Sequence, residues 1–228
     1  MRKILGAPFR QAVKLGTLQT NPLASLDPLK TNRIEKGVFT VEEVSRLLTA
    51  ADKDWKGLIL IAYLTGMRLR DAVDLKQENI DLEAKLISFQ AAKTEQKLVI
   101  PMHEDLLNHL LSLPSSDDPK AFLFPTLASK RTPALSVAFK QIMGKAGIDG
   151  GVAREKLGSK GKTISSRSFH SLRHSFVSAL ANANVSAELR QRLSGHASEE
   201  MHKLYTHHEL ETMRRAVTSI PRLPKGEL

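Results

Sequence analysis

The most informative part of the chain is residues 170–205, HSLRHSFVSALANANVSAELRQRLSGHASEEMHKLY. His170 and Arg173 stand three apart near its start, so on a helix they share a face. Gly195-His196 follows, and Tyr205 comes nine residues after His196. Tyrosine offers a phenol nucleophile, arginine a fork for two phosphate oxygens, and histidine a proton carrier or hydrogen-bond donor. Singly, each residue has a more ordinary structural explanation, so their joint order and spacing carry the argument.

The apolar residues of this stretch recur at helical spacing. After the helix of His170 and Arg173, two further helices are expected, with the second broken by Gly195 just before His196. Their apolar positions are Val177, Ala179, Leu180 and Ala181, then Val185, Leu189 and Leu193. The stretch therefore predicts a helical setting for the polar residues.

The chain upstream is also mainly helical. Thr40 and Glu43 form a capping box that starts a helix, and the nearly all-apolar segment 58–64 predicts a deeply buried helix ended by Gly66. Two more helical stripes are expected at 106–111 and at 135–142, the second ended by Gly144 or Gly147.

Residues 79–102 break the helical pattern. Short β-like runs separated by turns at 83–84 and 94–96 predict a small three-stranded antiparallel sheet. Their apolar residues are Ile80 and Leu82, then Leu86, Ile87 and Phe89, then Leu98, Val99 and Ile100. The expected fold class is therefore mainly α with one small sheet.

Two cationic residues stand out in this upstream part. Arg68 follows the buried helix and needs an anionic partner, which Asp71 or Asp74 supplies if its role is only structural. Lys93 lies at the second turn of the sheet, where a solvated turn lysine is the ordinary alternative.

The bulk composition agrees with a nucleic-acid partner. The chain has 228 residues, 41% of them hydrophobic, and a net charge of +10. Such a charge favours a polyanion such as nucleic acid, although an ordinary basic protein is the alternative. With no cysteine, disulfides, thiolate catalysis and cysteine zinc sites are excluded. No apolar run approaches a membrane span and no signal peptide is visible, so we expect a cytoplasmic protein.

The chain is expected to have two parts. Residues 1–36 hold one amphipathic helix to about residue 18, interrupted or started near Pro8, and a basic linker; residues 37–228 form the main domain. A lone helix cannot bury its apolar face. Either it packs on the main domain, or it is the last helix of an upstream domain whose earlier part is missing; we favour the second.

Two further patterns remain open. Residues 148–166 are rich in glycine and lysine, which suits a flexible basic loop for phosphate contacts or an ordinary solvated insertion. His170 and His174 have a metal-ligand spacing, but the pattern lacks the glutamate of His-Glu-x-x-His, so no metal site is expected.

The order Arg…Lys…His-x-x-Arg…Gly-His…Tyr resembles the tyrosine recombinases, also called the phage integrase family. The matching residues are Arg68, Lys93, His170, Arg173, His196 and Tyr205, and the resemblance spans about Pro22 to Leu210. It implies the catalytic-domain fold of that family, with residues 1–36 as the remnant of its N-terminal core-binding domain. It also implies a site-specific recombinase or integrase that cleaves and rejoins DNA.

The resemblance also implies the central catalytic roles. Tyr205 would attack the scissile phosphate to give a 3′-phosphotyrosine and a free 5′-hydroxyl. Arg68 and Arg173 would clamp the two non-bridging oxygens and stabilise the transition state.

The remaining roles follow in the same way. Lys93 would protonate the leaving 5′-oxygen, His170 would assist proton transfer at the tyrosine, and His196 would hydrogen-bond the phosphate. Asp71 would orient Arg68 from behind. One departure from the family pattern is Ser194, where leucine or methionine is more usual.

The implied reaction exchanges one phosphodiester for another, so we expect no cofactor and no metal. The implied partner is double-stranded DNA, with a tetramer on paired sites and a monomer or weak oligomer without DNA. Residues 209–228 carry an apolar stripe that docks either on a neighbouring subunit or in cis; its members are Leu210, Met213, Ala216, Val217 and Ile220.

Two other functions fit part of the pattern. A type IB topoisomerase uses the same nucleophile and similar cations, but relaxes supercoils as a monomer. A DNA-binding module that has lost activity is the alternative from another class, and the occupied catalytic positions speak against it. The biological task stays open among phage integration, transposon movement, chromosome-dimer resolution and inversion.

Overall fold

The chain divides into two compact units, residues 1–33 and residues 34–228. The computed structural model describes residues 2–24, 26, 37–92, 94–114, 116–154, 164–195 and 207–224. The first unit contains α1 (Arg2–Lys14), which continues through Pro8 with one backbone donor fewer instead of starting or breaking there. Its assignment as the remnant of an upstream domain stays a prediction.

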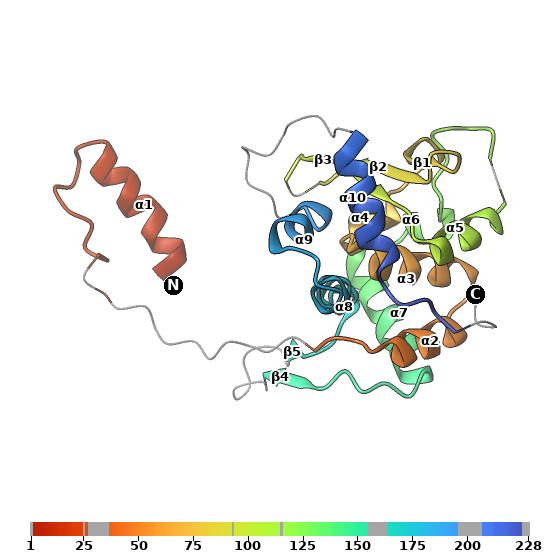
Figure 1. Cartoon of the computed structure of the whole chain (residues 1–228). Coiled ribbons are helices and arrows are strands. Elements are labelled where there is room, and N and C mark those ends of the chain that lie inside the picture. Colours follow the sequence, from red (N-terminus) through yellow and green to blue (C-terminus); the bar gives the residue numbers. More distant parts are fainter. Residues whose placement is uncertain are drawn as a thin grey trace. The chain divides into compact units, whose positions relative to one another are not determined.

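The second unit is mainly helical, as the sequence predicts (Figure 1). Its helices are α2 (Val41–Ala50), α3 (Lys53–Thr65), α4 (Leu69–Val73), α5 (Glu104–Leu111), α6 (Pro125–Ala128), α7 (Thr132–Lys145), α8 (Phe169–Asn182), α9 (Ala187–Leu193) and α10 (His207–Thr218), with a short 3-10 turn, η1 (Gln77–Asn79). The predicted capping box is present: Glu43 N–H donates to Thr40, and Thr40 N–H donates to the Glu43 carboxylate.

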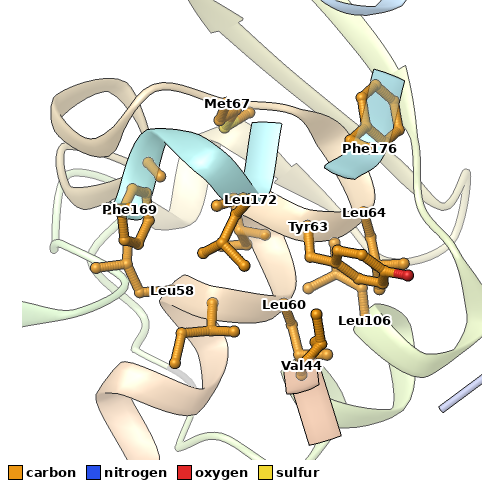
Figure 2. Packing of buried hydrophobic residues seen from close by; sticks show 14 of the residues in the cluster. Val44, Leu58, Leu60, Tyr63, Leu64, Met67, Leu106, Phe169, Leu172 and Phe176 are labelled. Atoms are coloured by element: carbon orange, nitrogen blue, oxygen red, sulfur yellow. The ribbon is translucent and has the colours of Figure 1, made fainter. Parts of the chain in front are cut away.

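Helix α3 lies at the centre of the core. All residues from Gly57 to Thr65 are buried, and α3 packs against α2, α5 and α8. Figure 2 shows the contact with α8, where Phe169, Leu172 and Phe176 lie over the α3 side chains. Because α3 is fixed by packing on all sides, its C-terminal end is a rigid platform for the residues that follow it.

The three-stranded antiparallel sheet is confirmed. It comprises β1 (Ile80–Asp81), β2 (Leu86–Gln90) and β3 (Lys97–Pro101) in that spatial order. Ile87 faces Ile100, and Phe89 faces Leu98. These alternating residues are buried while their neighbours within the strands, apart from the buried Pro101, are more exposed, so one face of the sheet packs on the core.

Two local predictions differ from the structure. Residues 148–166 were expected as an irregular loop, but β4 (Val152–Arg154) pairs antiparallel with β5 (Ile164–Ser165) within it. The short strands of this ribbon have almost no alternation of apolar and polar residues, so the sequence does not predict them. Residues 155–163 lie outside the described residues. The helices expected at His170–Arg173 and at residues 177–181 are one helix, α8, since no helix-breaking residue lies between them.

The C-terminal stripe is buried on its own domain in this single chain. Met213, Ala216 and Val217 of α10 are buried, and α10 packs against β3 (Figure 1). Two contacts anchor the segment that follows: the His103 ring bonds the Ile220 carbonyl at 3.2 Å, and Leu223 N–H donates to Asp105 at 3.0 Å. Docking on a neighbour in a DNA complex stays a prediction.

Candidate active site

Arg68 stands between α3 and α4. Gly66 ends α3 with a left-handed backbone, φ 70°, and Arg68 follows as the extended N-cap of α4. Its Nη1 lies 3.7 Å from an oxygen of Asp71, whose side chain is only 5% exposed. The burial of that carboxylate makes the pair a fixed one, because a buried charge keeps its counter-charge.

Asp71 also holds the turn between β2 and β3. Its other oxygen accepts the backbone N–H of Ala92 at 3.1 Å. The turn itself closes through backbone bonds of Ala91, whose N–H donates to the Gln96 carbonyl at 2.8 Å and whose carbonyl accepts from the N–H groups of Glu95 at 2.8 Å and Thr94 at 3.2 Å. Asp71 therefore ties Arg68 to the turn that carries Lys93; Lys93 itself lies outside the described residues.

Arg173 joins the ends of two helices. It is buried at 4% exposure, and its Nη1 donates to the carbonyl of Gly66 at 2.6 Å. Its Nη2 donates to the carbonyl of Ser194, at the end of α9. Burial first, and the charge of Arg68 second, lower the pKa of Arg173 to about 10, so the guanidinium stays charged at neutral pH.

Gly195 brings the end of α9 onto the sheet. Its backbone is left-handed, φ 63°, and a Cβ built on it would lie 2.8 Å from a methyl of Leu98 in β3. Glycine thus permits both the turn and the close approach. The predicted site residues His196 and Tyr205 come directly after Gly195 and just before α10, and both lie outside the described residues.

His170 lies on the first turn of α8, as predicted, with its ring edge-on to that of His174 at 4.8 Å between centroids. Both rings and Arg173 line one recess of about 420 Å³ between α8 and α9. Among the described residues, no group of three or more histidine, cysteine, aspartate or glutamate side chains has metal-binding geometry. In the same residues, no helix is long and apolar enough to cross a membrane.

The structure thus brings together four predicted site residues: Arg68, Asp71, His170 and Arg173, at the ends of α3 and α8. Sequence reasoning missed Ser175, whose hydroxyl accepts Phe39 N–H at 2.7 Å and donates to the Ser171 carbonyl at 2.9 Å. The bond from Phe39 joins the start of the domain to α8, the helix of His170 and Arg173. Its only sequence signal is a serine one helical turn after another serine.

Comparisons with known proteins all match integrases and tyrosine recombinases. The model of the phage integrase family matches residues 37–212. The integrase of Escherichia phage P2 is 28% identical over 203 residues, which are 88% of this chain and 52% of the relative. Tyrosine recombinase XerD of Neisseria meningitidis serogroup B (strain ATCC BAA-335 / MC58) is 27% identical over 198 residues, 84% of this chain and 65% of the relative. The chain thus spans about half to two thirds of these relatives.

Solved structures confirm the predicted fold. The integrase from mycobacterium phage Brujita superposes with a TM-score of 0.62 at 21% identity, covering 98% of this chain and 72% of that one. A lambda integrase(75–356) dimer bound to a COC′ core site gives 0.62 at 20% identity, covering 90% and 74%. A lambda integrase tetramer bound to a Holliday junction gives 0.60 at 21% identity, covering 88% and 56%.

Proposed function

The chain belongs to the phage integrase family, and from this membership we propose that it cleaves and rejoins double-stranded DNA at specific sites through a 3′-phosphotyrosine intermediate. The observation that carries the proposal is the junction of Arg68 and Arg173. Two guanidinium groups lie close enough for one charge to lower the pKa of the other, and Asp71 offers them a single carboxylate. A phosphate supplies the anion that this pair of cations favours.

The geometry suits stabilisation of a transition state. Arg173 is held by two carbonyls and Arg68 by Asp71, so both guanidinium groups are oriented before substrate binds. Donors fixed in advance cost no reorganisation when charge develops on the phosphate oxygens. This is the role proposed for both arginines.

The proposed reaction exchanges bonds one for one. The Tyr205 phenol oxygen bonds to phosphorus while the bond to the 5′-oxygen breaks, and Lys93 gives that oxygen its proton. His170 takes the phenol proton, and His196 donates a hydrogen bond to the phosphate. Rejoining reverses these steps, so bond energy is conserved in the phosphotyrosine and no ATP is needed.

Recombination requires two duplexes, and we propose a tetramer on paired sites. The lambda integrase structures named above contain a dimer on a core site and a tetramer on a Holliday junction, which supports this assembly. In the proposed assembly, α10 leaves its own domain and docks on the neighbouring subunit, so the position of Tyr205 depends on that neighbour.

The test is covalent trapping. We would incubate the chain with nicked duplexes made from the DNA that flanks its gene, and look for a protein–DNA adduct on a denaturing gel. Tyr205→Phe should lose the adduct and keep DNA binding. The chain has two tyrosines, and the other, Tyr63, is buried in α3.

Tyr63→Phe is therefore a matched control that should keep the adduct. An adduct that survives Tyr205→Phe would refute the assignment of the nucleophile. Wild-type protein that binds its site without ever forming an adduct would instead support a DNA-binding module without activity.

A further inference from the structure

The recess between α8 and α9 holds more positive charge than the proposed chemistry uses. Its lining includes His170, Arg173 and His174 from α8 and Arg190 from α9, and no aspartate or glutamate. Val38 and Val177 form part of its apolar wall. Arg68 and Arg173 account for the scissile phosphate in the proposed mechanism, which leaves Arg190 without a role.

Arg190 differs from several other arginines of the described residues, which pair with carboxylates. Those pairs are Arg68–Asp71, Arg70–Asp74, Arg167–Glu43, Arg192–Glu188 and Arg222–Glu104. Arg190 instead donates its Nε to the carbonyl of Val185 at 3.1 Å, and within the described residues no carboxylate lies at ion-pair distance from it. A carbonyl orients the guanidinium but leaves its charge uncompensated.

We propose that Arg190 binds a phosphate of the DNA backbone beside the scissile phosphate. The inference rests on the proposed function, because the scissile phosphate would lie against Arg173, on the wall of the same recess. Each DNA strand carries a charge about every 3.4 Å along the axis, so neighbouring phosphates follow closely on either side. The Nε–Val185 bond leaves the two terminal nitrogens of Arg190 as the donors, the geometry with which arginine grips a phosphate.

The chain offers a matched control on the same helix. Arg192 is two residues away, is also partly buried, and pairs with Glu188 at 3.4 Å. Removing the Arg192 charge changes the net charge as much as removing that of Arg190. A difference between the two variants therefore reports the position of the charge and not its number.

The experiment measures binding to a mixed-sequence 30-bp duplex across a series of salt concentrations, since phosphate contacts do not depend on sequence. Each neutralised phosphate contributes about 0.9 to the slope of log K against log salt. Arg190→Gln should make this negative slope less steep by about 0.9, because one phosphate contact is lost. It should also weaken binding roughly fivefold, as for one partly exposed charged contact. Arg192→Gln should leave the slope within about 0.3 of wild type.

Two more variants separate charge from packing. Arg190→Lys keeps the charge and should keep most of the slope, while Arg190→Met keeps the apolar stem and should lose as much slope as Arg190→Gln. Thermal unfolding shows which variants are folded, and Arg190→Met replaces Arg190→Gln if the latter cannot be purified. Equal slopes for Arg190→Met and wild type, or an equal loss for Arg192→Gln, would overturn the proposal.

The outcome is independent of cleavage. Wild-type protein that forms no phosphotyrosine adduct would refute the proposed function, whatever the binding slopes are. Wild-type protein that forms the adduct, with an Arg190 variant that binds DNA with an unchanged slope, would refute only the role of Arg190.

Discussion

Gly66 ends α3 at the point where Arg68 and Arg173 meet, and replacing it with alanine should damage the domain severely. Its φ of 70° is a conformation that side chains with a Cβ rarely adopt, at a cost of about 1–2 kcal/mol. A Cβ there would also lie 2.6 Å from the ring of Phe176, which is fully buried and cannot move aside freely. Overpacking of a core costs about 1–3 kcal/mol more, so we expect a loss of about 2–5 kcal/mol.

Two other glycines separate the cost of the left-handed backbone from the cost of overpacking. Gly147 has φ 64° but its Cβ would meet only an arginine nitrogen at 3.6 Å, so Gly147→Ala should cost the backbone term alone, about 1–2 kcal/mol. Gly144 is helical and its Cβ would meet nothing within 4 Å. Gly144→Ala should therefore stabilise the domain, by about 0.4–1 kcal/mol.

Urea unfolding of the three variants beside wild type measures these differences, with the denaturant slope checked for constancy. The expected order of stability is Gly144→Ala, wild type, Gly147→Ala and then Gly66→Ala. If Gly66→Ala loses no more than Gly147→Ala, the close contact with Phe176 does not constrain this position and the reasoning is wrong.

Four further predictions follow from the site and the fold. Arg68→Ala should slow cleavage at saturating DNA by about 10²–10³ with little loss of DNA affinity. Arg70, which pairs with Asp74, is the control, and Arg70→Ala should leave the cleavage rate unchanged. Equal cleavage rates for Arg68→Ala and wild type would contradict this. Adduct formation should persist in excess EDTA, and its abolition by the chelator with recovery on added magnesium would indicate another mechanism. Deleting 209–228 should prevent tetramer assembly on DNA while some cleavage of isolated sites survives; unchanged assembly would refute exchange of the segment. Burial lowers the pKa of His103, so the free energy of unfolding should fall as pH drops below the ordinary histidine value of 6.5. His103→Gln should reduce this dependence of the unfolding free energy on pH, as measured by urea titrations at pH 5–8.

Local sequence patterns are enough to predict most of the elements and the order of the site residues, but they miss the β4–β5 ribbon and divide α8 into two helices. The capping box at Thr40 and Glu43, the buried helix α3 and the three strands all follow from local rules: backbone donors need partners, and apolar residues recur at the period of the element that buries them. The glycine ends of α3 and α9 follow in the same way, because only glycine enters the left-handed region without cost. The roles of Lys93, His196 and Tyr205 stay predictions.

The contacts that hold the site depend on tertiary packing and do not follow from local patterns. Arg173 reaches the Gly66 carbonyl 107 positions away, Asp71 reaches Ala92 across 21, and His103 reaches Ile220 across 117. Each of these bonds uses a backbone group as partner, and backbone groups are the same at every residue. A side-chain pattern therefore cannot predict these hydrogen bonds, because their backbone partners are selected by the packing that brings distant segments together.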